Sequence, residues 1–156
     1  MTSVPSQDKT EKAFRTALRL LSFRERSENE IRLRLKQKKF TKKAIEQTVR
    51  YLLDEGLLND RRFTRSWISS RLERHFGLKK ICLELREKGI AKQLIEEEIN
   101  HIRNAYPEEE IIADLAKKRI NKYKDIGPLK AKQRTFNYLM ARGFSPEIIR
   151  HALNAL

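Results

Sequence analysis

Residues 31–49 read IRLRLKQKKFTKKAIEQTV and residues 81–99 read ICLELREKGIAKQLIEEEI, so five hydrophobic positions coincide without a gap. At this offset of 50 residues the matching pairs are Ile31/Ile81, Leu35/Leu85, Phe40/Ile90, Ile45/Ile95 and Val49/Ile99. The last two thirds of the pattern return, at an offset of 54 residues, as Leu139, Phe144, Ile149 and Leu153. Self-similarity at such a period is typical of repeat architectures, and three copies would fill the chain.

Local signals favour three short helices in each copy, although one segment in each of the first two copies alternates like a strand. Ser27 and Glu30 have the spacing of a capping box, in which each side chain accepts the other residue's backbone N–H. Gly89 and Gly143 stand where the C-terminus of a helix needs a residue with positive φ. For the last helix of each copy the expected N-cap residues are Thr41, Ala91 and Ser145, the last followed by Pro146 at the first helical position.

The sequence therefore predicts an all-α protein made of tandem three-helix repeats in an elongated, curved array, which small-angle scattering would test. The first helices of the copies are placed by stripes at helical spacing that start at Phe14, Phe63 and Ile112. The predicted organisation is a flexible N-terminus at 1–9 and repeats at 10–56, 57–104 and 105–156. Leu33 and Leu83 lie on the other side of their helices, and we expect them to pack against a neighbouring helix.

Charge is the most informative feature of the composition. The 156 residues carry a formal net charge of +14, distributed as +5 over residues 1–60, +5 over 61–106 and +4 over 107–156. A charge of this size usually has an anionic partner, and its even distribution argues against a disordered basic arm. A single cysteine, Cys82, excludes an intrachain disulfide, and no long apolar segment predicts a membrane span or signal peptide. We expect a cytoplasmic protein, monomeric, with Cys82 as a packed thiol.

The sequence offers no catalytic or metal-binding constellation. His75, His101 and His151 have no second ligand at metal spacing, and Cys82 has no histidine within a helical turn. Neither of the glycine-rich phosphate-binding patterns occurs. Acidic runs such as 96–98 are typical of solvated helix faces. We therefore expect no enzyme activity and no cofactor.

Basic residues are the candidate binding residues, because as a set they favour a polyanion or an acidic protein surface as the partner. Phe40 and Phe144 occupy matching slots with Ile90, so they are interpreted as core rather than as platforms for base stacking. The candidates are Arg32, Lys36, Lys39, Lys42 and Lys43 in the first copy, Arg71, Arg74, Lys79 and Lys80 in the second, and Lys117, Lys118, Arg119, Lys122, Lys130, Lys132 and Arg134 in the third.

Four segments, in order, resemble the signatures of the RecX family. Residues 24–31 (RERSENEI) are similar to its Arg-(Asp/Glu)-x-Ser-x-x-Glu-(Leu/Ile) opening, and residues 56–63 (GLLNDRRF) to its Gly-(aromatic/Leu)-Leu-(Asn/Asp)-Asp-x-x-Phe signature. Residues 75–90 resemble its aromatic-Gly, Ile, Glu-Leu and Lys-Gly-Ile stretch, and residues 142–144 its closing Arg-Gly-aromatic. Leu78 and Cys82 depart from the pattern, where a small residue or Pro and a polar residue are usual.

The resemblance implies tandem three-helix repeats and a negative regulator of the RecA recombinase. Such a protein would lie in the groove of the RecA–DNA filament, limit its extension or promote its disassembly, and lower ATP hydrolysis, strand exchange and SOS repressor cleavage. Single- or double-stranded DNA is a further expected partner.

Two alternatives remain from the residues alone. One is a DNA-binding protein that uses a copy as a helix-turn-helix, although the second and third helices lack the Arg/Asn/Gln cluster that reads base edges. The other is a helical-repeat scaffold for acidic proteins.

Overall fold

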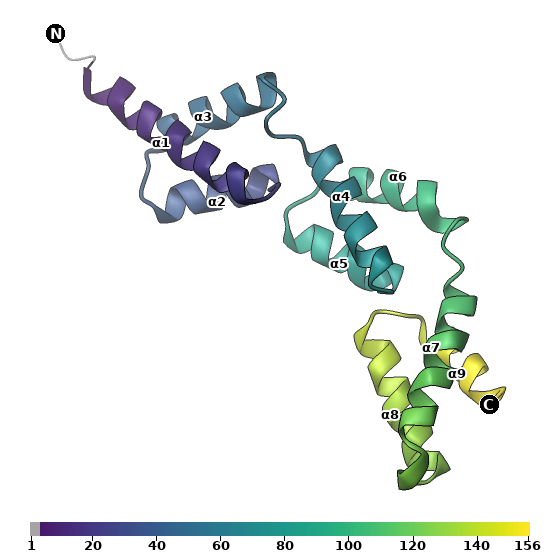
Figure 1. The fold of residues 1–156 in the computed structure, drawn as a ribbon. Helices are drawn as coiled ribbons and strands as arrows, with labels where there is room; N and C mark the ends of the chain where they lie inside the picture. The colour runs from purple at the N-terminus through teal and green to yellow at the C-terminus, as the bar shows by residue number, and fades with distance from the viewer. Residues whose placement is uncertain (1–3) are drawn as a thin grey trace. The chain divides into compact units, whose positions relative to one another are not determined.

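The computed structural model describes residues 4–156, and the side chains of residues 8–156. Within this range the chain forms helices and no strand (Figure 1). The first three helices are α1 (Val4–Phe23), α2 (Glu28–Gln37) and α3 (Lys42–Asp54), followed by α4 (Asp60–Glu73), α5 (Leu78–Glu87) and α6 (Lys92–Arg103). The last group comprises α7 (Glu108–Lys122), the short 3₁₀ helix η1 (Lys124–Ile126), α8 (Pro128–Ala141) and α9 (Pro146–Asn154). The all-α prediction with three helices in each repeat is confirmed.

The chain divides into two compact units. One contains the chain up to Arg65 together with Arg86–Lys92, and the other contains Ser66–Leu85 together with Gln93–Leu156. In the first unit α1, α2 and α3 pack on one another, and in the second α7, α8 and α9 do the same. Each unit therefore joins one complete three-helix repeat to part of the repeat between them.

The hydrophobic positions that define the repeat form the cores. The first core holds Ala13, Ala17, Ile31, Leu35, Ala44, Ile45, Val49, Leu52 and Leu58, with Phe40 half-buried against it. The last core holds Ile112, Ala116, Leu139, Phe144, Ile149 and Leu153. In the middle repeat the matching residues Ile81, Leu85, Ile90, Ile95 and Ile99 are buried as well. The interpretation of Phe40 and Phe144 as packing residues is confirmed.

Helix ends follow the sequence signals at most positions. Ser27 and Glu30 form the complete capping box of α2, and the Thr41 hydroxyl accepts the Ala44 amide at the start of α3. Gly89 and Gly143 have φ of 76° and 86°. Ser145 is the N-cap residue of α9 but its hydroxyl donates to the Glu147 carboxylate at 2.5 Å instead of capping a backbone amide. That part of the capping prediction is wrong, because Glu147 lies within reach of the same hydroxyl.

Two further expectations concern the N-terminus and two leucines. Residues 4–9 of the segment predicted to be flexible belong to α1, which i,i+4 ion pairs from Lys12 to Asp8 and from Arg15 to Glu11 support; residues 1–3 lie outside the described range, and the flexibility itself stays a prediction. Leu33 and Leu83 were expected to be covered by a neighbouring helix, yet their exposed fractions are 50% and 54%. Each lies on the side of its helix opposite the stripe that enters the core.

Candidate functional site

Four of the five candidate cations in the first repeat surround the turn between α2 and α3. Lys36, Lys39, Lys42 and Lys43 are all exposed, and Lys39 takes the positive φ of 64° that a glycine takes in the other repeats. Arg32 differs, because its guanidinium pairs with the carboxylates of Glu28, at 3.0 Å, and Glu46. Its charge is balanced inside the unit, whereas the four lysines form no ion pair within the described residues.

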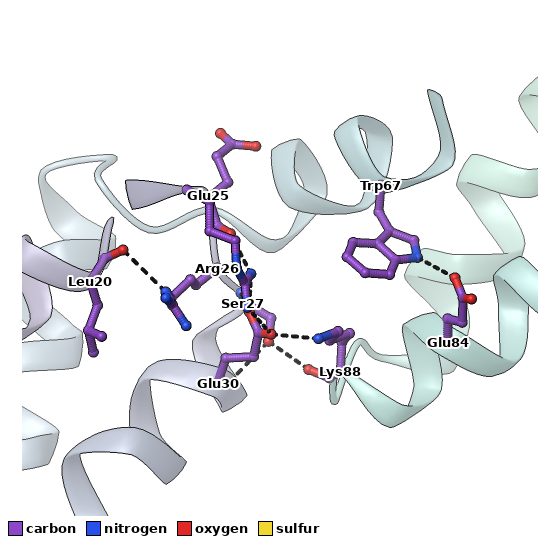
Figure 2. Close-up of polar contacts among 9 residues, drawn as sticks. Leu20, Glu25, Arg26, Ser27, Glu30, Trp67, Glu84 and Lys88 are labelled. Carbon is purple, nitrogen blue, oxygen red and sulfur yellow. Dashed lines mark hydrogen bonds and ion pairs between the residues drawn. The ribbon is translucent and has the colours of Figure 1, made fainter. Parts of the chain in front are cut away.

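The candidate cations of the second repeat likewise include one that forms an ion pair and others that do not. Arg71 pairs with Glu84 at 2.7 Å, and the same carboxylate oxygen accepts the indole N–H of Trp67 at 2.9 Å (Figure 2). Arg74 and Lys79 are exposed and Lys80 is half-buried, and none of these three forms an ion pair within the described chain. Arg71 is thus a structural cation, and its three neighbours retain their charge for a ligand.

In the third repeat most candidates are exposed. Lys117, Lys118, Lys122, Lys130 and Arg134 are exposed, and Lys132 is half-buried. Arg119 lies flat over the ring of Tyr138, with its Cζ atom 3.9 Å from the ring centre. Its Nε is buried without a hydrogen-bond partner among the described residues. Cation–π contacts with Tyr138 and Tyr123 therefore hold Arg119 in place.

Residues from three of the resemblance segments, 24–31, 56–63 and 75–90, meet at a junction between the first and second repeats, which lies wholly within the first unit. The Ser27 hydroxyl accepts the Glu30 amide at 3.1 Å and donates to the Lys88 carbonyl at 2.6 Å (Figure 2). Beside it the Asp60 carboxylate accepts the Glu28 amide at 2.8 Å. We call these contacts, with those of Glu30, the first junction.

Glu30 is the electrostatic centre of the first junction. Its carboxylate accepts the Ser27 amide at 3.1 Å, both terminal nitrogens of Arg24 at 3.0 and 3.1 Å, and Nζ of Lys88 at 2.8 Å. Burial alone would raise the pKa of Glu30, but the hydrogen bonds from Arg24, Lys88 and Ser27 lower it to about 2. The carboxylate is therefore ionised at neutral pH and joins the two repeats.

An equivalent second junction joins the second and third repeats within the other unit. The Gly77 amide donates to the Arg142 carbonyl at 2.7 Å, and the Leu78 amide donates to the Glu108 carboxylate at 2.7 Å. The Tyr106 hydroxyl donates to the Phe76 carbonyl at 2.8 Å, and burial, with the nearby Glu108 charge, raises the pKa of Tyr106 to about 12. Tyr106 therefore remains a neutral donor at all physiological pH values.

Cations gather around the Phe76 ring at the second junction. The guanidinium carbons of Arg142, Arg71 and Arg74 lie 4.4, 5.2 and 5.5 Å from the ring centre, and Nζ of Lys80 lies 4.9 Å from it. Arg142 also donates to the carbonyls of His75, at 3.1 Å, and of Arg74. The structure thus brings together Arg71, Arg74 and Lys80, and adds Arg142, which was not among the candidates.

Comparison with known proteins assigns all three repeats to one family. Family models described as the first, second and third three-helix domains of RecX match residues 13–52, 59–98 and 107–153 in that order. The chain belongs to the RecX family.

Curated relatives and solved structures agree with this family. The regulatory protein RecX of Pasteurella multocida is 32% identical over 85% of this chain and 80% of its own length. That of Chlorobium phaeobacteroides is 34% identical over 93% of both chains. The crystal structure of RecX from Lactobacillus salivarius superposes with a TM-score of 0.79 at 25% identity, covering 96% of this chain and 97% of that one.

RecX relatives are named regulatory proteins, in agreement with the prediction that this chain is not an enzyme. Among the residues that the structure describes, no group of His, Cys, Asp and Glu side chains is arranged to hold a metal ion. None of the described helices is both long and apolar enough to cross a membrane. Cys82, expected to be packed, is partly buried.

Sequence reasoning missed the residues that join the RecX repeats. Ser27, Glu30 and Lys88 all belong to segments that resemble the family, but the sequence alone does not show that Lys88 contacts Ser27 and Glu30, which lie 61 and 58 residues away. The available signal was the repeat itself, because Lys88 and Arg142 precede the same glycine and hydrophobe in successive copies. A residue shared by successive copies at a helix end is a candidate for a contact between repeats.

Proposed function

We propose that this chain is a negative regulator of the RecA recombinase that acts by binding the RecA–DNA filament. The observation that carries the proposal is the ordered match of all three RecX domains along the chain. Binding limits extension of the filament or promotes its disassembly, so that ATP hydrolysis, strand exchange and cleavage of the SOS repressor all decrease.

The exposed cations support a filament as the partner. Lysines at the α2–α3 turn and on α7 and α8 have no carboxylate partner within the described residues, so their charge is free to meet DNA phosphate or acidic protein side chains. Each repeat contributes a comparable share of the net charge of +14. The protein acts as a monomer in the cytoplasm, where RecA works, and requires no cofactor.

The direct test adds the protein substoichiometrically to RecA that is assembling on single-stranded DNA. We expect ATP hydrolysis and strand exchange to fall, and the protein alone to show no nuclease, ligase or ATPase activity. Unchanged RecA activity over a wide concentration range would overturn the proposed function while leaving the family assignment intact.

The contribution of the separate repeats can be measured by neutralising exposed cations in three sets. The sets are Lys36/Lys39/Lys43, Arg74/Lys79 and Lys118/Lys122/Lys130, each changed to alanine. Because each phosphate contact releases counterions, every set should weaken filament binding and reduce its salt dependence. A single set that abolished binding while the others changed nothing would favour one patch over contacts from every repeat.

The alternative supported by a specific observation is direct binding of DNA, since four cations surround the Phe76 ring. A helical scaffold for acidic proteins is the third candidate. Binding to naked DNA, to the RecA filament and to an acidic polypeptide, compared at one salt concentration, distinguishes the three. Tightest binding to the filament is the outcome that the proposed function requires.

A further inference from the structure

The two junctions occupy equivalent positions in the repeat but differ in charge. At the offset of 50 residues Arg24 corresponds to Arg74 and Glu30 to Lys80, and at the offset of 54 Lys88 corresponds to Arg142. The first junction therefore places one carboxylate between two cations. The second places three cations where the first has two cations and an acid.

The surroundings of these three cations do not supply the missing negative charge. Lys80 donates to the Ala141 carbonyl at 3.0 Å and Arg142 donates to the His75 and Arg74 carbonyls, so their partners are uncharged helix ends. A helix C-terminus carries only about half of an elementary negative charge, and α4 and α8 both end here. The two helix ends together offset only about one of the three positive charges.

The nearby carboxylates form no ion pair with these three cations. Glu84 binds Arg71 and the Trp67 indole, Glu108 accepts the Leu78 amide, and Glu147 accepts the Ser145 hydroxyl at 2.5 Å. Over the part of the chain that the structure describes, no ion pair forms at Arg74, Lys80 or Arg142. The three charged groups nevertheless lie within 5.5 Å of one ring centre, and a bound anion would lower the repulsion between them.

We propose that Arg74, Lys80 and Arg142 form a phosphate-binding site that takes a phosphodiester group of a nucleic-acid backbone. A carboxylate has two oxygens, and at the first junction Glu30 is satisfied by two cations and one amide. Two guanidinium groups and an ammonium offer more donors than a single carboxylate can accept, and a phosphate accepts such forked donors well. Lys79, which precedes Lys80 on α5, is exposed and would supply a further cation for an adjacent phosphate.

The test uses the full chain and a fluorescently labelled oligothymidylate, without RecA. Lys80→Glu reproduces the charge pattern of the first junction, so the introduced carboxylate occupies the site from within. We expect the affinity for the oligonucleotide to fall roughly tenfold or more. The log–log salt dependence should also fall by about 0.7 for each single-strand phosphate contact that is lost.

Lys9→Glu is the matched control, because Lys9 is exposed on α1, has no ion pair in the described chain, and changes net charge by the same amount. It should alter affinity by less than about twofold if long-range charge is screened. Equal losses from Lys80→Glu and Lys9→Glu would overturn the site, as would a wild-type chain that does not bind the probe.

Folding and ligand class are controlled separately. Lys80→Gln keeps a donor for the Ala141 carbonyl and should weaken binding less than Lys80→Glu, and both variants should keep the helical circular dichroism of the wild type. Polyglutamate offered in place of the oligonucleotide should bind weakly and be insensitive to Lys80→Glu. Preferential binding of polyglutamate at this site would contradict the phosphate assignment. Since no arm contains RecA, the site and the proposed function can fail independently.

Discussion

At the first junction a serine hydroxyl and an ionised glutamate join successive repeats, whereas at the second a glycine amide and cations around a phenylalanine ring do so. The shared part is the main-chain geometry. In both, the first amide of the middle helix of a repeat donates to a carboxylate at the start of the next repeat, from Glu28 to Asp60 and from Leu78 to Glu108. The two junctions therefore share their main-chain geometry, whereas the charge of their side chains differs.

The largest effect on stability is expected from replacing the glycine at each junction with alanine. A Cβ atom on Gly143 would lie 2.2 Å from Cβ, 2.7 Å from N and 2.9 Å from Cα of Lys80. Because two of these atoms are backbone and φ is 86°, Gly143→Ala should destabilise the second unit by about 3 kcal/mol or more. Urea unfolding followed by circular dichroism and by the fluorescence of Trp67, the only tryptophan, measures the change.

Two other Gly→Ala variants serve as comparisons for Gly143→Ala. Gly89→Ala would place its Cβ atom 2.4 Å from Cβ and 2.6 Å from Cγ and Nδ2 of Asn29, which are side-chain and not backbone atoms, so we expect a smaller loss than at Gly143. Gly56→Ala has φ of 68° but nothing within 4 Å, so it should show only the backbone strain of about 1 kcal/mol. The order Gly143, Gly89, Gly56 is the prediction, and equal losses at all three would mean that the junctions are not closely packed.

Charge at the first junction gives the next largest effect. Glu30→Gln keeps the shape but removes the negative charge between Arg24 and Lys88, so it should destabilise the first unit by about 2 kcal/mol at pH 7. The folded pKa is lowered from 4.5 to about 2, so the carboxylate stabilises the fold above pH 4.5 and loses this contribution as pH falls toward 2. The difference between wild type and Glu30→Gln in urea unfolding should therefore disappear over this interval.

The exposed Glu46, which pairs with Arg32, supplies the control for this titration. Glu46→Gln should change stability by less than about 1 kcal/mol at pH 7, because exposed ion pairs contribute little. A pH-independent loss in Glu30→Gln would show that the hydrogen-bonded shape of the side chain, and not its charge, holds the first junction together.

Particular residues show how far the sequence could predict these features. Periodicity placed Ile31, Ile81 and Leu139 in cores because a helix buries one stripe, and that rule needs no knowledge of partners. The partners of Glu30 could not be predicted, since Lys88 lies 58 residues away and only the fold brings it near. Charge counting likewise treated Arg32 and Lys36 alike, although Glu46 on the next helix neutralises only Arg32.

The smallest effects should come from Leu33 and Leu83, the hydrophobic residues that both repeats leave exposed next to their junctions. Because each is half exposed, Leu83→Ala should change the free energy of unfolding by less than about 0.5 kcal/mol. Leu85→Ala, two residues along the same helix and fully buried, should lose about 2 to 5 kcal/mol. Leu33→Ala and Leu35→Ala form the same pair in α2, so the ratio within each pair is independent of how the two junctions differ in charge. Comparable losses within either pair in urea unfolding would show that a neighbouring helix does cover the exposed leucine, as periodicity alone suggested.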